Sequence, residues 1–179
     1  MLFSQSTIAA TRTWTGLGVT NNWNDAANWS GGIVPGAADI ATFDATSSKN
    51  ATMNVAVNVL GVSIGSGYGG TITQAGGIAA TVGTTGWTEA GGTFVGGTAA
   101  FTVNGPFAIS GGSFSATTAT QSVSGAFTVS GGTFNAGTGT VSFGGAAATL
   151  TVSTADTFRN ITVAAGAKTI AAGTTLTAT

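Results

Sequence analysis

The chain has 179 residues, of which 42% are hydrophobic and only 5% are charged, and its formal net charge is −1. A helical protein of this length would contain far more Glu, Lys, Leu and Arg, and its 30 glycines fit turns better than helices. The apolar content and the near-zero charge also argue against disorder. The composition therefore favours a folded, all-β protein.

Several functions are disfavoured by composition alone. The four cations are scattered singly, so no basic patch for a nucleic acid is expected. Cysteine and histidine are absent, which removes disulfides, thiolate nucleophiles, imidazole bases and the usual zinc ligands. No apolar stretch approaches the roughly 18 residues of a membrane helix, so no membrane insertion is expected. We expect no cofactor and no metal.

Residues 1–45 do not share the repeat found later and are expected to form an N-terminal arm and a cap. The terminal unit of a repeat protein has to cover an open core, and large aromatic rings do this well. The expected cap residues are Trp14, Trp23, Trp29, Pro35 and Phe43. As an alternative, an exposed Trp23 or Trp29 would stack on a sugar, with Asn24, Asp25 and Asn28 binding its hydroxyls.

Residues 46–179 are expected to form the coils, which are less regular before residue 87. Apolar residues alternate from Met53 to Val59, which predicts one half-buried strand. The alternation continues from Leu60 one residue out of phase, which predicts a bulge near Leu60 and Gly61. The word Gly69-Gly70-Thr71-Ile72 is interpreted as an early copy of the later repeat.

Residues 87–145 repeat every 20 residues. The words WTEAGGTF, FAISGGSF and FTVSGGTF begin at Trp87, Phe107 and Phe127. A fixed period of this length predicts a parallel β-helix, or β-solenoid, whose coils bury their apolar face by stacking. We expect three short strands in each coil, for example 93–96, 100–104 and 107–110. The expected inward-facing ladder comprises Phe94, Phe114, Phe134, Phe107, Phe127, Ile109, Val129, Val103, Val123 and Phe143.

Glu89 breaks the apolar pattern, because it occupies the position of Ile109 and Val129 in the repeat. Burying a lone carboxylate is costly. We therefore expect either a local departure from the coil at Glu89 or a partner such as Asn, Arg or a backbone amide.

The N-terminal segment carries a resemblance. The motif W-x-G begins at Trp14 and is followed by N-W-x-x-G-x-x-P at 28–35 and D-x-A-x-F at 39–43. Two downstream segments, 127–145 and 157–170, also carry the resemblance. These motifs resemble the opening segment and coils of secreted bacterial parallel β-helix proteins, notably autotransporter passenger regions and related surface proteins. The resemblance implies an extracellular or cell-surface location. It implies no particular activity.

The favoured hypothesis is a non-enzymatic structural protein whose copies associate into a surface fibre or layer, with end-to-end association as one form of this hypothesis. Uncharged Thr- and Gly-rich strands lack the charges that normally block edge pairing, and the last residues, Thr174 to Thr179, carry no obvious cap. The expected partner is therefore the protein itself. The expected assembly ends are Met1, Leu2, Phe3, Ile170 and Leu176.

Three alternatives remain open. The first is an adhesin or glycan-binding module that recognises a surface polysaccharide. The second is a polysaccharide-active enzyme, but no two of the five acids form a close pair on the repeat, so no catalytic residue is assigned. A calcium site at Asp39 and Asp44 lacks a recognised ligand loop. The third is an ice-binding surface built on Thr98, Thr118, Thr120, Thr138 and Thr140.

Overall fold

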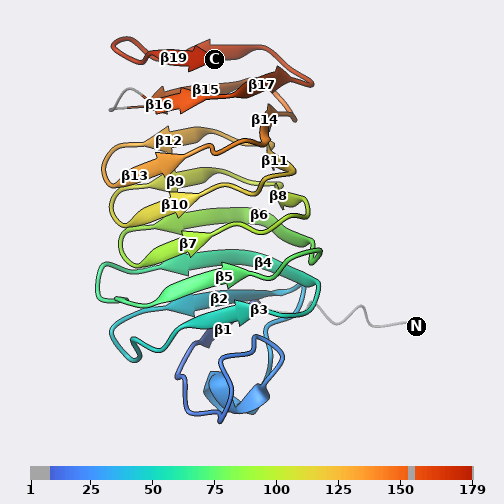
Figure 1. Cartoon of the computed structure of the whole chain (residues 1–179), viewed down its shortest axis with the longest axis vertical. Coiled ribbons are helices and arrows are strands. Elements are labelled where there is room, and N and C mark those ends of the chain that lie inside the picture. Colours follow the sequence, from blue (N-terminus) through green and yellow to red (C-terminus); the bar gives the residue numbers. More distant parts are fainter. Residues whose placement is uncertain (1–8, 153–155, 179) are drawn as a thin grey trace, which may run out of the picture.

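A computed structural model describes residues 9–152 and 156–178. The chain winds into a parallel β-solenoid of about six turns, each about 21 residues long, with the N-terminal cap at one end of its long axis (Figure 1). The prediction of an all-β solenoid with an aromatic N-terminal cap is confirmed. The described part has no α-helix, and its only helical turns are two 3-10 turns in the cap, η1 (Ala26–Asn28) and η2 (Ser30–Gly32).

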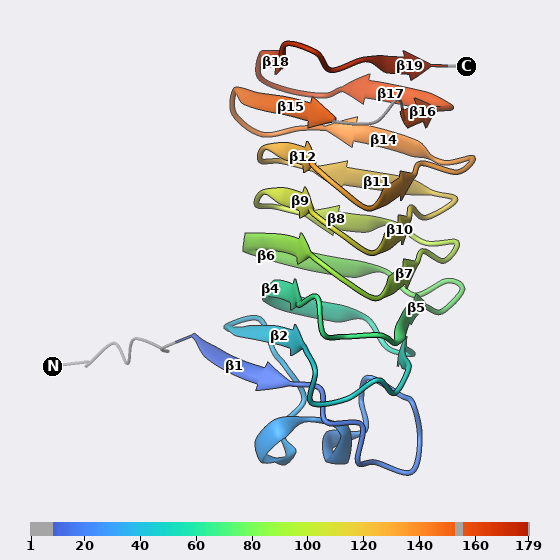
Figure 2. The same ribbon diagram turned by 90° about the vertical axis from the view of Figure 1, so that its left-hand side faces the viewer.

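Each coil has three faces, which the 90° view separates (Figure 2). Faces 1 and 2 belong to one twelve-stranded sheet, because two long strands run continuously across both faces. These two are β4 (Val57–Ile64) and β6 (Ala80–Glu89). Face 1 continues with β8 (Phe101–Val103), β11 (Thr120–Val123), β14 (Thr140–Phe143) and β17 (Asn160–Val163). Face 2 adds β1 (Ala10–Thr13), β2 (Asp39–Phe43), β9 (Phe107–Ile109), β12 (Phe127–Val129), β15 (Ala148–Val152) and β18 (Lys168–Ile170).

Face 3 is a separate five-stranded parallel sheet. Its strands are β3 (Ala51–Met53), β5 (Thr71–Gln74), β7 (Thr93–Val95), β10 (Ser113–Ser115) and β13 (Thr133–Asn135). Two further strands, β16 (Asp156–Phe158) and β19 (Leu176–Ala178), pair with each other beyond β13. The turn from face 2 to face 3 needs a left-handed residue, and Gly92, Gly112 and Gly132 supply it with φ of 65°, 77° and 69°.

The irregular region before residue 87 differs from its prediction in one respect. The bulge is present, as a register shift between Val59 and Gly61 where β4 pairs with β6. The prediction of a single strand from Met53 to Val59 is wrong, because β3 ends at Met53 and β4 begins at Val57 on another face. The corner between them keeps the apolar alternation, since Val55 is half-buried and packs against the core. Because the alternation of apolar residues continues through the corner, the sequence pattern does not show where β3 ends and β4 begins.

The interior is a continuous aromatic ladder. Phe114 lies in register with Phe94 below and Phe134 above, with ring centroids 4.5 Å and 5.6 Å away and nearly parallel planes. Phe107 and Phe127 stack at 5.1 Å on face 2 and meet the first column edge to face. All ten residues of the expected ladder are buried. Stacking between aromatic rings at equivalent positions of successive coils, rather than charge, thus fixes the register between coils.

This packing predicts the effect of Phe114→Ala. Phe114 is fully buried and contacts rings from three coils, so its removal leaves a cavity that the stacked neighbours cannot fill. We expect the free energy of unfolding to fall by about 3–5 kcal/mol, measured by chemical denaturation. The matched control is Ser115→Ala, one residue further along the same strand and facing outward, with an expected change within about 0.5 kcal/mol. Equal losses in the two variants would contradict an inward Phe114.

Candidate functional site

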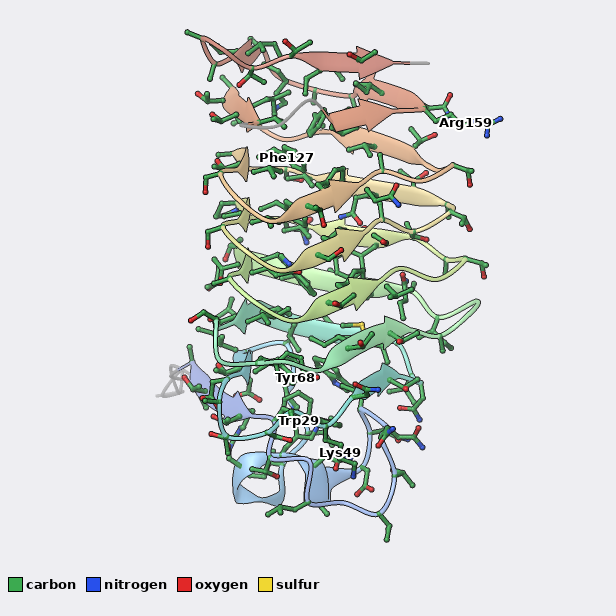
Figure 3. The ribbon with its side chains drawn as sticks, turned by 60° about the vertical axis from the view of Figure 1, so that its left-hand side comes forward. Trp29, Lys49, Tyr68, Phe127 and Arg159 are labelled. Carbon is green, nitrogen blue, oxygen red and sulfur yellow. The ribbon has the colours of Figure 1, made fainter. Side chains whose placement is uncertain are left out.

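The capped end contains a buried aromatic cluster. Trp14, Trp23 and Trp29 are each at most 2% exposed. The centroids of Trp23 and Trp29 lie 4.7 Å apart and those of Trp14 and Trp29 lie 5.1 Å apart, both edge to face. Phe43 contacts all three and then Tyr68, which joins the cap to the coils. Figure 3 shows Trp29 and Tyr68 inside the ribbon at this end. The rings cover the first coil, and their faces are closed to a sugar.

The polar side-chain atoms of Trp14, Trp29 and Tyr68 are used internally. Trp29 Nε1 donates to the Trp23 carbonyl at 2.7 Å. Trp14 Nε1 and the Tyr68 hydroxyl both donate to the Lys49 carbonyl at 2.9 Å. Burial raises the pKa of Tyr68 above its usual range, so its hydroxyl remains a donor. Pro35 is also buried. Trp14, Trp23, Trp29 and Phe43 thus form one packed cluster.

A buried asparagine fixes the loop that follows β1, residues 15–22, which we call the cap loop. Asn28 is fully buried, and its Nδ2 donates to the carbonyls of Thr20 at 3.0 Å and Asn22 at 3.1 Å. Its Oδ1 accepts from Gly18 N at 2.9 Å. The Lys49 ammonium donates to the Gly18 carbonyl and to Asn28 Oδ1. The side chains of Asn28 and Lys49 therefore hold the cap loop at its middle and near its C-terminal end.

The cap loop displays aliphatic side chains to solvent. Leu17 is 82% exposed and Val19 is fully exposed, and Ile33, beside η2, is about half exposed. At the opposite end Val163 and Ile170 are 55% and 46% exposed. Val95 is the one large aliphatic residue exposed on the sides of the solenoid within the described chain. Exposed apolar side chains therefore gather at the two ends.

The end opposite the cap is formed by β17, β18 and β19, which we call the open coil. Within residues 9–152 and 156–178, no further strand pairs with the outer edges of these three strands. Val163 lies over Phe143, and Ile170 lies over Leu150, so both continue core columns. Leu176 is half-buried. Of the expected assembly ends, Ile170 and Leu176 belong to the open coil, whereas Met1, Leu2 and Phe3 lie outside the described residues.

The sides of the solenoid carry hydroxyl groups and no exposed charge. From Asn50 to Val152 the one charged residue is Glu89, which is buried. Face 1 shows a column in register along the coils: Thr81, Thr102, Ser122, Ser142 and Thr162. The threonines considered for ice binding are divided between two places. Thr120 and Thr140 pair on face 1, whereas Thr98, Thr118 and Thr138 are exposed at the preceding corner.

The carboxylates of the cap have separate structural partners. Asp25 accepts from the Thr20 hydroxyl at 2.8 Å, and this hydrogen bond lowers its pKa. Asp39 pairs with Arg12 Nε at 3.7 Å and accepts from Gly36 N. Asp44 accepts from Thr46, which lowers its pKa. Among the described residues, no group of three or more acids could hold a metal ion, and no pocket is present.

Glu89 is 1% exposed and stays in the regular coil, in register between Ile64 and Ile109. The expected local departure is therefore absent. Its partner is the Trp87 indole, whose Nε1 donates to Oε2 at 3.1 Å. The Ser113 N–H nearby favours the charged form slightly, but it donates to the Gly92 carbonyl, and Glu89 Oε1 accepts no hydrogen bond. Burial raises the pKa of Glu89 to about 7, against the opposing effect of the indole.

Comparison with known proteins gave no matching family model, no matching curated protein and no matching solved structure. The resemblance to autotransporter passenger regions therefore stays a prediction. The structure shows the β-solenoid fold. No helix in the described residues is long and apolar enough to cross a membrane.

Sequence reasoning missed the cap loop. It considered Asn28 as a sugar ligand only within the glycan-binding alternative, whereas the side chain is buried and fastens the loop. It gave no role to Leu17 and Val19. A usable signal was present, because two aliphatic residues flank a glycine inside a segment otherwise rich in turn residues.

The role of Asn28 can be tested by substitution. Asn28→Ala removes the acceptor of the Gly18 N–H and the donor to the Thr20 and Asn22 carbonyls, so we expect a loss of about 1–3 kcal/mol in the free energy of unfolding. It should also deprotect the Gly18 amide in hydrogen exchange. Asn28→Asp keeps the acceptor and loses only the two donors, so Gly18 should stay protected. A Gly18 amide protected in both variants would contradict this role.

Glu89 makes stability depend on pH. Its folded-state pKa of about 7 lies above the ordinary value of 4.5, so folding favours the protonated form. The stability is complete below about pH 4.5, falls as the pH rises towards 7, and then stays low. From the shift in pKa, the total loss is on the order of 3 kcal/mol. Denaturation midpoints measured between pH 5 and pH 8.5 would show the fall.

Glu89→Gln is the matched control, because it keeps the shape of the side chain and cannot ionise. Its midpoint should be nearly constant across the same range. The lowered pKa values of Asp25 and Asp44 act only at more acidic pH, where protonation would remove their contribution. A wild-type protein as stable at pH 8.5 as at pH 5 would show that Glu89 ionises freely in the core.

Proposed function

We propose that this chain is a non-enzymatic, extracellular structural protein whose solenoid units associate end to end, as subunits of a surface fibre or layer. The observation that supports this most directly is the distribution of exposed apolar side chains. They gather at the cap loop and at the open coil, while the sides present hydroxyls. Association through the ends buries the apolar groups and leaves the polar sides in water.

The open coil supports the same proposal through its backbone. The outer edge of a strand presents unpaired N–H and C=O groups that pair readily with another chain. Proteins usually block such edges with charges, bulges or covering segments. At the open coil, Arg159 is exposed and points away from the solenoid (Figure 3). Lys168 is used within the chain, because its Nζ donates to the Gly144 and Ala146 carbonyls at 2.7 Å and 2.6 Å.

The location outside the cell rests on the sequence resemblance alone. The glycan-binding alternative has less support, because Trp23 and Trp29, which would stack on a sugar, are buried in the cap. No observation on the described residues favours a polysaccharide-active enzyme or an ice-binding surface over self-association.

The proposal predicts concentration-dependent assembly. The wild-type protein should form rods or fibres, seen by negative-stain electron microscopy and sedimentation velocity. Val163→Lys combined with Ile170→Lys places two charges over the end of the core, so this double variant should remain monomeric because burying unpaired charges is costly. Val95→Lys alters an exposed aliphatic residue on a side face and should assemble as the wild type does. Dispersed wild-type monomers at every concentration would overturn the proposal.

A further inference from the structure

The cap loop is built to hold Leu17 and Val19 in solvent. The glycine between them packs on polar side chains of the cap, since a Cβ at Gly18 would lie 2.5 Å from Asp25 Oδ2 and 2.8 Å from Asn28 Oδ1. Both backbone polar groups of Gly18 are bonded, its N–H to Asn28 and its carbonyl to Lys49. With Gly18 pinned against the cap, its two neighbours extend outward.

This arrangement is unusual for an ordinary surface loop. Isolated exposed aliphatic residues need no explanation, but these two adjoin a fully buried asparagine that uses its donors and its acceptor to fix their loop. The restraint also lowers the conformational entropy that the loop would lose on binding. A fixed pair of aliphatic side chains therefore calls for an apolar partner surface.

The open coil supplies such a surface on a second copy of the chain. Val163 and Ile170 extend the core columns of Phe143 and Leu150 and remain about half exposed. Charge also favours this partner. The cap and first coil carry three carboxylates, Asp25, Asp39 and Asp44, against two cations. In the sequence from residue 156 to residue 179 there are two cations, Arg159 and Lys168, and one acid, Asp156. The side-chain charge is thus net negative at one end and net positive at the other.

We propose that Leu17 and Val19 of one copy pack against Val163 and Ile170 in the open coil of the next copy. The inference rests on the proposed end-to-end association and specifies its joint. The joint is heterologous, because it uses a different surface on each partner, and a heterologous contact that does not close gives a filament. The N-terminal contact is the cap loop, in place of the residues Met1, Leu2 and Phe3 expected from the sequence.

A complementation experiment tests this joint. One double variant, Leu17→Ser with Val19→Ser, removes the aliphatic pair and keeps the open coil. The other, Val163→Ser with Ile170→Ser, removes the apolar groups of the open coil and keeps the pair. All four positions are exposed, so both proteins should fold, as circular dichroism and thermal unfolding would verify. Val95→Ser serves as the control for loss of an exposed aliphatic residue on a side face.

Each double variant alone should be monomeric, with its joint at least about tenfold weaker than in wild type, because two apolar contacts are lost. Mixed in equal amounts, the two variants should form a 1:1 dimer that grows no further, since only one competent pair of surfaces remains. Sedimentation velocity would detect it. The Val95→Ser control should form filaments like wild type.

Other outcomes would overturn the inference in distinguishable ways. If the Leu17 and Val19 variant assembles as wild type does, the cap loop is not the contact, although end-to-end association stands. If that variant forms dimers alone, the joint is symmetric, between two open coils. If the mixture stays monomeric, the two surfaces do not meet. If the wild type itself never assembles, the proposed function fails as well.

Discussion

The structure depends on one constraint, which is that equivalent side chains of successive coils stand in register at the spacing of parallel strands. Phe94, Phe114 and Phe134 meet this constraint with rings close to parallel. Coils of equal length keep the column aligned, and the glycines at the corners allow the chain to turn within that length. Each coil therefore depends on its neighbours for its hydrophobic contacts, as in other repeat proteins.

Because each coil depends on its neighbours for packing, the core needs another cover wherever a neighbouring coil is missing. An interior coil has a neighbour on both sides, but a terminal coil exposes half of its core. At one end three buried tryptophans cover the core, and the indole N–H groups of Trp14 and Trp29 donate to nearby carbonyls. At the open coil the core columns reach the surface as Val163 and Ile170. Charged side chains other than Glu89 lie beside these two ends, so the ends differ from the sides in both polarity and charge.

The repeat itself was predictable from the sequence, because the period of 20 and the inward positions follow directly from the words at 87–145. The corner between β3 and β4 was not, because Val55 keeps the alternation across it. The burial of Trp23 and Asn28 was not predictable for another reason. Tryptophan and asparagine suit both a sugar site and a cap, and only their contacts distinguish the two. The exposed cap loop depends on Lys49 and Asn28, which no local pattern connects.

Polar residues inside the solenoid show how strongly the stacking dominates. Gln74 satisfies its amide with the Ile78 and Ala100 carbonyls and the Gly97 N–H. Gln121, between Phe101 and Val141 in register, is fully buried and makes no side-chain hydrogen bond in the described chain. Glu89 keeps its place in the same way, with one indole as its donor. Because Gln121 and Glu89 each have buried apolar neighbours in register above and below, turning either side chain outward would disrupt the stacking on both sides. Leaving a buried amide unpaired or a buried carboxyl protonated costs less free energy than losing this stacking. The coil therefore keeps its register.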